Sequence, residues 1–224
     1  MNVLNSSLLA AVATLLTAGA SVAHAQVRIT EIAPWGSAST TPYQTDWFEL
    51  TNFGDATVDL TGWSMDDSSN GSAKVALSGI SSIAAGETVI FTETAATASF
   101  LSTWFGDQAP AGLQIGNYTG KGVGLSQSGD AVNIYNASGD LHANLTFGTS
   151  DGLTQTFDNA AGLNNTTVSQ LSVVGVNGAF AAVNHLVEIG SPGAIAAAVP
   201  EPQSYALLLA GLGVFGVIAR KRQR

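Results

Sequence analysis

The chain has 224 residues, a net charge of −9 and no cysteine. The lack of cysteine excludes disulfides, a thiol nucleophile, a thiolate metal site and an iron–sulfur cluster. Residues 26–199 contain three basic and fifteen acidic side chains, a net charge of −12. Such a surface repels phosphate backbones, which argues against nucleic acid as a partner and favours cations, basic partners or plain solubility.

Residues 1–25 are typical of a secretory signal peptide. The stretch 8–22 is small or apolar and uncharged, and Ala23-His24-Ala25 supplies the small-x-small pattern that a signal peptidase requires. We therefore predict cleavage between Ala25 and Gln26, although no Lys or Arg precedes the apolar stretch. The alternative is a buried apolar helix of the mature fold.

The N-terminal half of the mature region predicts mostly strands. Alternating or apolar runs bounded by turn residues indicate strands at 27–32, 47–52, 58–63 with a kink at Gly62, 75–77, 80–83 and 88–92. Residues 95–105 are the best helical candidate, because Phe100, Leu101, Trp104 and Phe105 are spaced to share one face. We interpret these aromatic side chains as core.

The C-terminal half predicts a second group of strands. They are expected at 123–125, 131–135, 141–147, 168–176 and 180–189, with a hairpin turn at 136–140 and a loop at 148–166. Alternation in 141–147 places Leu141, Ala143, Leu145 and Phe147 on one face. Short strands with turns at regular spacing favour an all-β fold, an antiparallel β-sandwich.

The end of the chain combines three features. Val199-Pro200-Glu201-Pro202 is followed by an apolar run at 205–219 and a basic cluster at 220–224. The apolar run holds 15 residues, and a helix of that length rises about 22 Å, short of a ~30 Å hydrocarbon core. Snorkelling arginines can make up part of the gap, and the positive-inside rule puts the basic end in the cytoplasm and the domain outside.

This order of features resembles the PEP-CTERM sorting signal of Gram-negative bacteria, with Pro200, Glu201 and Pro202 matching the motif. The resemblance covers residues 198–224 and implies an exosortase-type processing enzyme in the inner membrane as a partner. It further implies transient residence in that membrane and delivery to the cell surface or extracellular matrix, in company with extracellular polysaccharide or other surface proteins. The alternative is a permanent C-terminal anchor.

Residues 26–197 resemble a lamin-tail-like domain. The resemblance rests on the ordered segments 27–32, 46–52, 58–63, 124–132 and 191–193. It implies an immunoglobulin-like β-sandwich. Phe48, Leu50 and Trp63 are then expected in the core, and Glu49 is expected to face solvent or to bond to a loop.

No local motif marks a catalytic or cofactor site. The sequence has no His-Glu-x-x-His pair, and its Gly-x-Ser-x-Gly match at residues 148–152 lies in the expected loop 148–166 rather than between a strand and a helix. Glu31 and Glu49 could pair as in a glycosidase, but we expect two separate carboxylates on strand surfaces. The leading prediction is a non-enzymatic adhesion or interaction module. A secreted hydrolase, with a Ser-His-Asp triad assembled in space from His142 or His185, is the alternative.

One loop partly matches a calcium-binding pattern. Asp66, Ser68 and Asn70 occupy positions 1, 3 and 5 of an EF-hand loop, but Leu77 stands where the bidentate glutamate is required. We therefore expect an ordinary polar turn and no metal, with a calcium-dependent adhesin as a further alternative. Asn-x-Ser/Thr triplets, which permit glycosylation, begin at Asn70, Asn117, Asn136, Asn144, Asn164 and Asn165.

Overall fold

The structure is a computed structural model of the full chain, and it describes residues 27–37, 41–68, 74–120, 123–150, 152–160 and 166–194. The predicted signal peptide with its cleavage site, and the sorting tail with its apolar run, lie outside the described residues. Within the described ranges, no helix is long and apolar enough to cross a membrane.

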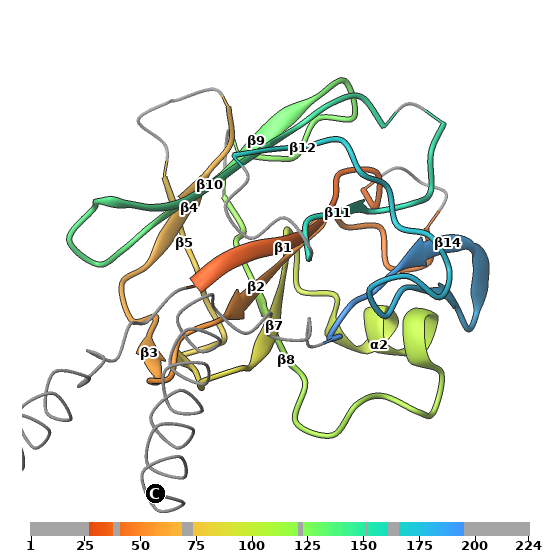
Figure 1. Cartoon of the computed structure of the whole chain (residues 1–224), viewed down its shortest axis with the longest axis horizontal. Helices are drawn as coiled ribbons and strands as arrows, with labels where there is room; N and C mark the ends of the chain where they lie inside the picture. The colour runs from red at the N-terminus through yellow and green to blue at the C-terminus, as the bar shows by residue number, and fades with distance from the viewer. Residues whose placement is uncertain are drawn as a thin grey trace, which may run out of the picture.

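Two five-stranded sheets form a β-sandwich (Figure 1). The first sheet has the strand order β11 (Phe157–Asp158), β1 (Val27–Ala33), β2 (Trp47–Asn52), β7 (Thr88–Thr92), β8 (Gln114–Asn117). The second has the order β12 (Thr167–Val168), β10 (Leu141–Phe147), β9 (Asp130–Tyr135), β4 (Ser64–Asp66), β5 (Val75–Ala76). Two small pairs join β3 (Val58–Asp59) to β6 (Ser82–Ile83) and β13 (Phe180–Ala182) to β14 (His185–Gly190).

The expected all-β sandwich is confirmed, but the sheets are not purely antiparallel. At one edge of each sheet a strand runs parallel to its neighbour, β8 beside β7 and β12 beside β10. A parallel neighbour requires a crossover connection rather than a hairpin. The helix supplies this connection between β7 and β8, and the chain passing through β11 supplies it between β10 and β12. Neither crossover was predicted from strand spacing.

The main core fills the space between the two sheets. Alternation in β2 sends Phe48 and Leu50 into it, where they join side chains of the second sheet such as Ile134 and Phe147. The Phe48 ring stacks on Phe91 with centroids 5.7 Å apart. These positions confirm the predicted core role of Phe48, Leu50 and Trp63, all of which are buried.

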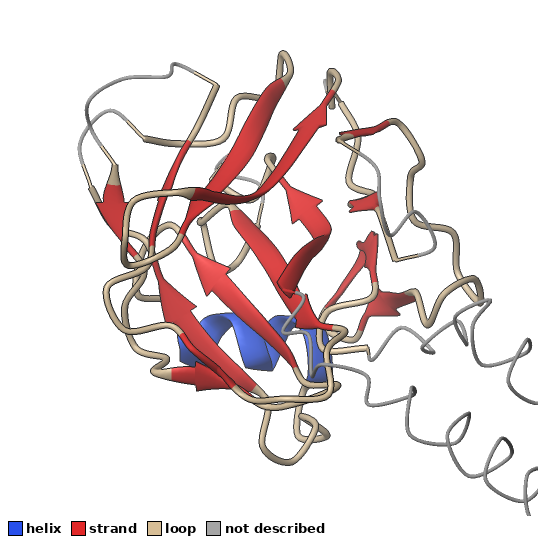
Figure 2. Cartoon of the chain, turned by 60° about the vertical axis from the view of Figure 1, so that its left-hand side comes forward, coloured by secondary structure: helices blue, strands red, loops and turns tan. Residues whose placement is uncertain are grey.

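The opposite face of the first sheet is also covered. The predicted helix is confirmed as α2 (Thr97–Phe105), and it lies across this face (Figure 2). Its Phe100 and Trp104 rings meet the Trp47 ring edge-on at centroid distances of 5.5 and 5.8 Å. Because both faces are covered, every residue of β2 and β7 is buried, polar ones included.

The β13–β14 turn fastens the C-terminal hairpin to the end of α2. The last carbonyls of a helix have no partner within the helix. Here the backbone N–H of Val183 donates to the Trp104 carbonyl at 3.2 Å, and that of Asn184 donates to the Thr103 carbonyl at 2.9 Å. The Asn184 side-chain amide donates to the Ser102 carbonyl at 2.7 Å. The hairpin therefore completes the helix terminus from a distant part of the sequence.

Several predicted strand boundaries are wrong. The strand expected at 58–63 ends at Asp59, because the backbone turns at Gly62, whose φ is 79°. The next strand, β4, begins at Ser64, and β3 pairs with β6 whereas β4 pairs with β9. Residues 123–125 form no strand, although Val123 and Leu125 are buried. The expected single face of 141–147 is interrupted by a bulge after Leu141, which leaves this side chain 56% exposed.

Candidate functional site

Glu31 and Glu49 lie directly opposite each other on neighbouring strands. They are cross-strand partners in the β1–β2 pairing, and Glu31 is also the partner of Asp158 on β11. Directly opposed residues of an antiparallel pair have their Cβ atoms about 5 Å apart. A row of three acidic residues therefore crosses three strands of the first sheet, and all three side chains are buried.

A β-bulge at Thr30 creates this opposition. The pairing runs Ile29 with Leu50 and then Glu31 with Glu49, so that Thr30 is the additional residue. Without the bulge, Glu31 would face Phe48 and point to the other side of the sheet, because side chains alternate along a strand. The extra residue thus brings the two carboxylates onto the face that α2 and the C-terminal hairpin cover.

Backbone groups near the end of the described chain bind both carboxylates. The N–H of Ser191 donates to Glu31 Oε1 at 2.7 Å, and the N–H of Gly193 donates to Glu49 Oε2 at 2.7 Å. The Thr156 hydroxyl also donates to Glu31 Oε1. We refer to Glu31, Glu49, Ser191 and Gly193 as the carboxylate latch, because the glutamates of β1 and β2 hold the segment that follows β14.

Hydroxyl groups line the rest of this face. The Thr30 hydroxyl donates to Glu49 Oε1 at 2.6 Å and lies 3.0 Å from the Thr51 hydroxyl. The chain of hydroxyls continues from Thr51 to Thr88 at 2.8 Å. Buried polar groups need such partners because an unpaired one loses its hydration without compensation.

One oxygen of the latch remains without a partner. Glu31 Oε2 is buried and accepts no hydrogen bond from the described residues. Burial raises the pKa of Glu31 to about 7, and hydrogen bonds from Thr156 and Ser191 only partly oppose this effect. Burial and the nearby charge of Glu31 raise the pKa of Glu49 well above its usual value. The pair therefore keeps at least one proton at neutral pH, which relieves the repulsion between opposed carboxylates.

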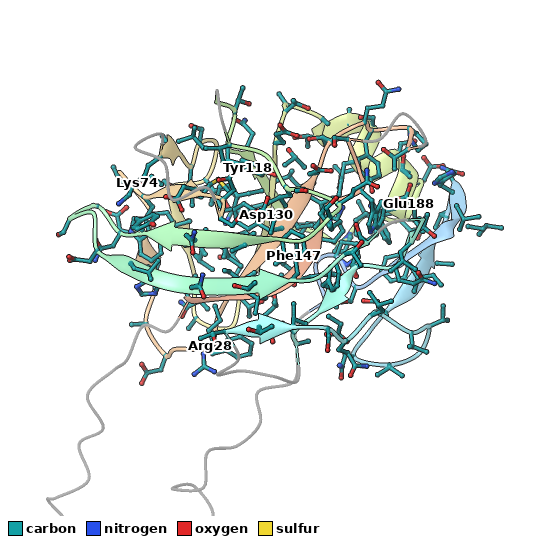
Figure 3. All side chains as sticks on the ribbon, turned by 90° about the horizontal axis from the view of Figure 1, so that it is seen from above. Arg28, Lys74, Tyr118, Asp130, Phe147 and Glu188 are labelled. Atoms are coloured by element: carbon teal, nitrogen blue, oxygen red, sulfur yellow. The ribbon has the colours of Figure 1, made fainter. Side chains whose placement is uncertain are left out.

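A second polar cluster lies on β14. Glu188 is fully buried, and it accepts a hydrogen bond from the Tyr43 hydroxyl at 2.6 Å. The His185 Nδ1 atom lies 2.5 Å from the other carboxylate oxygen, while the His185 side chain keeps 28% of its surface exposed. Burial raises the pKa of Glu188, although both partners oppose the effect. Figure 3 shows Glu188 at the end of the molecule opposite Lys74.

The calcium candidates are only partly described. Asn70 lies outside the described residues. The Asp66 carboxylate accepts hydrogen bonds from the Asn133 amide at 2.8 Å and the Tyr135 hydroxyl at 3.2 Å, and the Ser68 N–H donates to Asp130 at 2.8 Å. In this structure Asp66 therefore accepts from donors of β9, whereas Ser68 donates to a carboxylate of β9. In the part of the chain that is described, no three His, Asp or Glu side chains are arranged to hold a metal ion.

The sequence identified Glu31 and Glu49 but placed them wrongly on the surface. Both are buried. Glu49 accepts a hydrogen bond from the loop residue Gly193, which is the second of the two arrangements expected for it. His142, the other candidate histidine, packs on the Trp63 ring at 4.6 Å. Sequence analysis missed Thr156, Ser191 as a donor, and the His185–Glu188 contact. The spacing of His185 and Glu188 could not have revealed the last of these, because residues three apart in a regular strand point to opposite faces.

The fold and the buried row of acidic residues define an immunoglobulin-like β-sandwich that holds carboxylates inside. The family model of the Lamin Tail Domain matches residues 20–149, more than half of the chain, and the chain belongs to this family. The PEP-CTERM protein-sorting motif matches residues 198–223. Both resemblances are therefore confirmed, and the motif implies an exported chain that an exosortase-type enzyme processes. Comparison with curated proteins finds no match.

Proposed function

We propose that this protein is a non-enzymatic adhesion or interaction module of the cell surface or extracellular matrix. Its apolar run, residues 205–219, enters the inner membrane during sorting, and an exosortase-type enzyme then removes it near Pro200-Glu201-Pro202. The producing cell is a Gram-negative bacterium, and the partners of the mature domain are extracellular polysaccharide or other surface proteins.

The observation that supports a non-enzymatic role is that the glutamates of the carboxylate latch are bound inside the domain. Glu31 and Glu49 are the acidic pair that a glycosidase would need. Both are buried, and a backbone N–H group of the domain itself donates to one oxygen of each. A pair bound in this way stabilises the closed fold, which is consistent with a rigid module that presents its surface to a partner.

Intact mass of the protein recovered from the producing strain tests the sorting part of the proposal. We expect a chain that begins at Gln26 and ends close to the Pro-Glu-Pro motif. A variant with Pro200→Ala and Pro202→Ala should keep its tail and stay with the membrane fraction. A wild-type mass that includes residues 205–224 would contradict removal of the tail.

Cell attachment tests the adhesion part. A deletion strain should attach less well to a surface or to its own matrix, and the wild-type gene should restore attachment. The Pro200→Ala, Pro202→Ala variant should not restore it, because its domain stays at the inner membrane. Equal attachment of the deletion and wild-type strains would argue against an adhesive role.

The hydrolase alternative has one specific observation in its favour. His185 and Glu188 form a histidine–carboxylate contact, which is two thirds of a Ser-His-Asp type triad. A His185→Gln variant and the wild type would be compared on ester and glycoside substrates. Activity in the wild type that disappears in the variant would favour the hydrolase over the adhesion module.

A further inference from the structure

The exposed large apolar side chains of this domain are concentrated near its C-terminal end. Seven are exposed in the described chain, and six belong to a stretch of fifteen residues in and before the β13–β14 hairpin: Val173, Val174, Val176, Val183, Leu186, Val187. We call these six the C-terminal apolar face. Their exposed fractions run from 43% to 73%, which is more than isolated surface hydrophobics need.

The hairpin that carries this face is firmly attached. Its turn donates hydrogen bonds to the last carbonyls of α2, and the Thr154 hydroxyl donates to the Val187 carbonyl at 2.5 Å. Leu186 and Val187 are adjacent in β14, so their side chains point to opposite sides of the strand. Both are exposed, so the hairpin projects from the molecule, as its position at one end in Figure 1 also indicates.

The same part of the chain is nearly free of charge. Between Asp158 and Glu201 the ionisable side chains are His185 and Glu188 alone, and Glu188 is fully buried. The region 26–199 as a whole carries a net charge of −12. The stretch that carries the C-terminal apolar face therefore adds little charge of its own that an anionic surface would repel.

The chain leaves the described domain beside this face. A Cβ atom added to Gly178 would lie 2.9 Å from the Cβ of Ala194, so the last described residue touches the loop that carries Val173, Val174 and Val176. Ten residues separate Ala194 from the start of the apolar run at Tyr205, and the eleven residue steps between the two span at most about 40 Å when fully extended. A membrane that holds the run thus stays within reach of the face.

From this geometry we infer that the C-terminal apolar face rests on the lipid bilayer while the sorting tail is still attached. The inference rests on the proposed insertion of residues 205–219. The tether keeps the face at a high effective concentration near the lipid, and its exposed apolar side chains gain by leaving water. Removal of the tail ends the tether, and the domain then leaves the membrane with this face free.

Single-cysteine variants provide the test, because the natural chain has no cysteine. The full chain carrying Leu186→Cys would be labelled with an environment-sensitive fluorophore and reconstituted into phosphatidylcholine vesicles that contain a nitroxide-labelled lipid. Leu141→Cys is the matched control, since Leu141 is also an exposed apolar residue but lies in the β9–β10 hairpin at the opposite end (Figure 1). Flotation of the vesicles measures insertion of the tail separately.

We expect the label at position 186 to be quenched several-fold more than the label at 141 in chains that float with the vesicles. Equal quenching at the two positions in floating chains would overturn the membrane contact and leave the sorting proposal intact. Chains that do not float would overturn both. Protection of position 186 without lipid, increasing with protein concentration, would assign the face to a second copy of the chain and overturn the membrane contact.

Discussion

Replacing Glu31 by glutamine should flatten the pH dependence of folding stability. The folded chain raises the pKa of Glu31 from its usual value of 4.5 to about 7, so it binds the proton more tightly than the unfolded chain does. The stability that protonated Glu31 contributes is fully present when the pH is below the pKa of Glu31 in the unfolded chain. It is lost as the pH rises through about 7, the pKa of Glu31 in the folded chain. The difference between the two pKa values corresponds to a loss of about 3 kcal/mol.

Glutamine reproduces the protonated side chain at every pH. Its carbonyl oxygen can accept from Ser191 and Thr156, and its amide group takes the place of Oε2, which accepts no hydrogen bond from the described part of the chain. Glu31→Gln should therefore equal the wild type near pH 4.5 and exceed it at pH 8, by up to about 3 kcal/mol. Removal of the Glu31 charge also lessens the repulsion that raises the pKa of Glu49, which leaves some of the slope in the variant.

Urea unfolding of residues 26–197 between pH 4.5 and pH 8 measures this difference. Burial also raises the pKa of Asp46 to about 7, but Asp46 is present in both proteins, so the difference between their slopes reports Glu31 together with its effect on Glu49. Asp55→Asn serves as a control for the loss of one carboxylate at an exposed position. Parallel curves for wild type and Glu31→Gln, or a variant that is less stable at pH 8, would refute the reasoning.

Three further changes test other parts of the structure. Gly36→Ala should destabilise the domain, since an added Cβ would lie 2.1 Å from the Thr45 carbonyl oxygen; an unchanged urea midpoint would contradict this close approach. Tyr43→Phe removes the donor to buried Glu188 and should cost about 1–3 kcal/mol in urea unfolding, whereas no loss would mean that water replaces the hydroxyl. Calcium or a chelator should leave the melting temperature unchanged, because the Asp66 carboxylate already binds donors of β9; a calcium-dependent rise would favour the calcium-dependent adhesin.

Alternation along the strands predicted which side chains share a face but not what covers that face. In β2 the sequence correctly directs Phe48 and Leu50 into the core. The same alternation puts Glu49 on the other side of the sheet, which we expected to face solvent or a loop. That side is covered by α2 and by a hairpin more than 100 residues further along the chain, so local patterning could not reveal the burial of Glu49.

The bulge at Thr30 and the edge strands could not be predicted from the sequence, for a related reason. A strand with one extra residue has the same composition as a regular one, yet the insertion reverses the face on which Glu31 lies. The two-residue strand β11 contains too few residues to show any period. In both cases the structure depends on a partner strand that lies elsewhere in the sequence.

The carboxylate latch also sets when the domain can close. Ser191 lies 160 residues after Glu31, and Gly193 lies 144 residues after Glu49. Contacts of such sequence separation form late, because the whole intervening chain must be brought together first. A chain that crosses the membrane with its N-terminus leading cannot form the two latch bonds until Ser191 and Gly193 have emerged. Completion of the fold and arrival of the sorting tail at the membrane are therefore nearly simultaneous events.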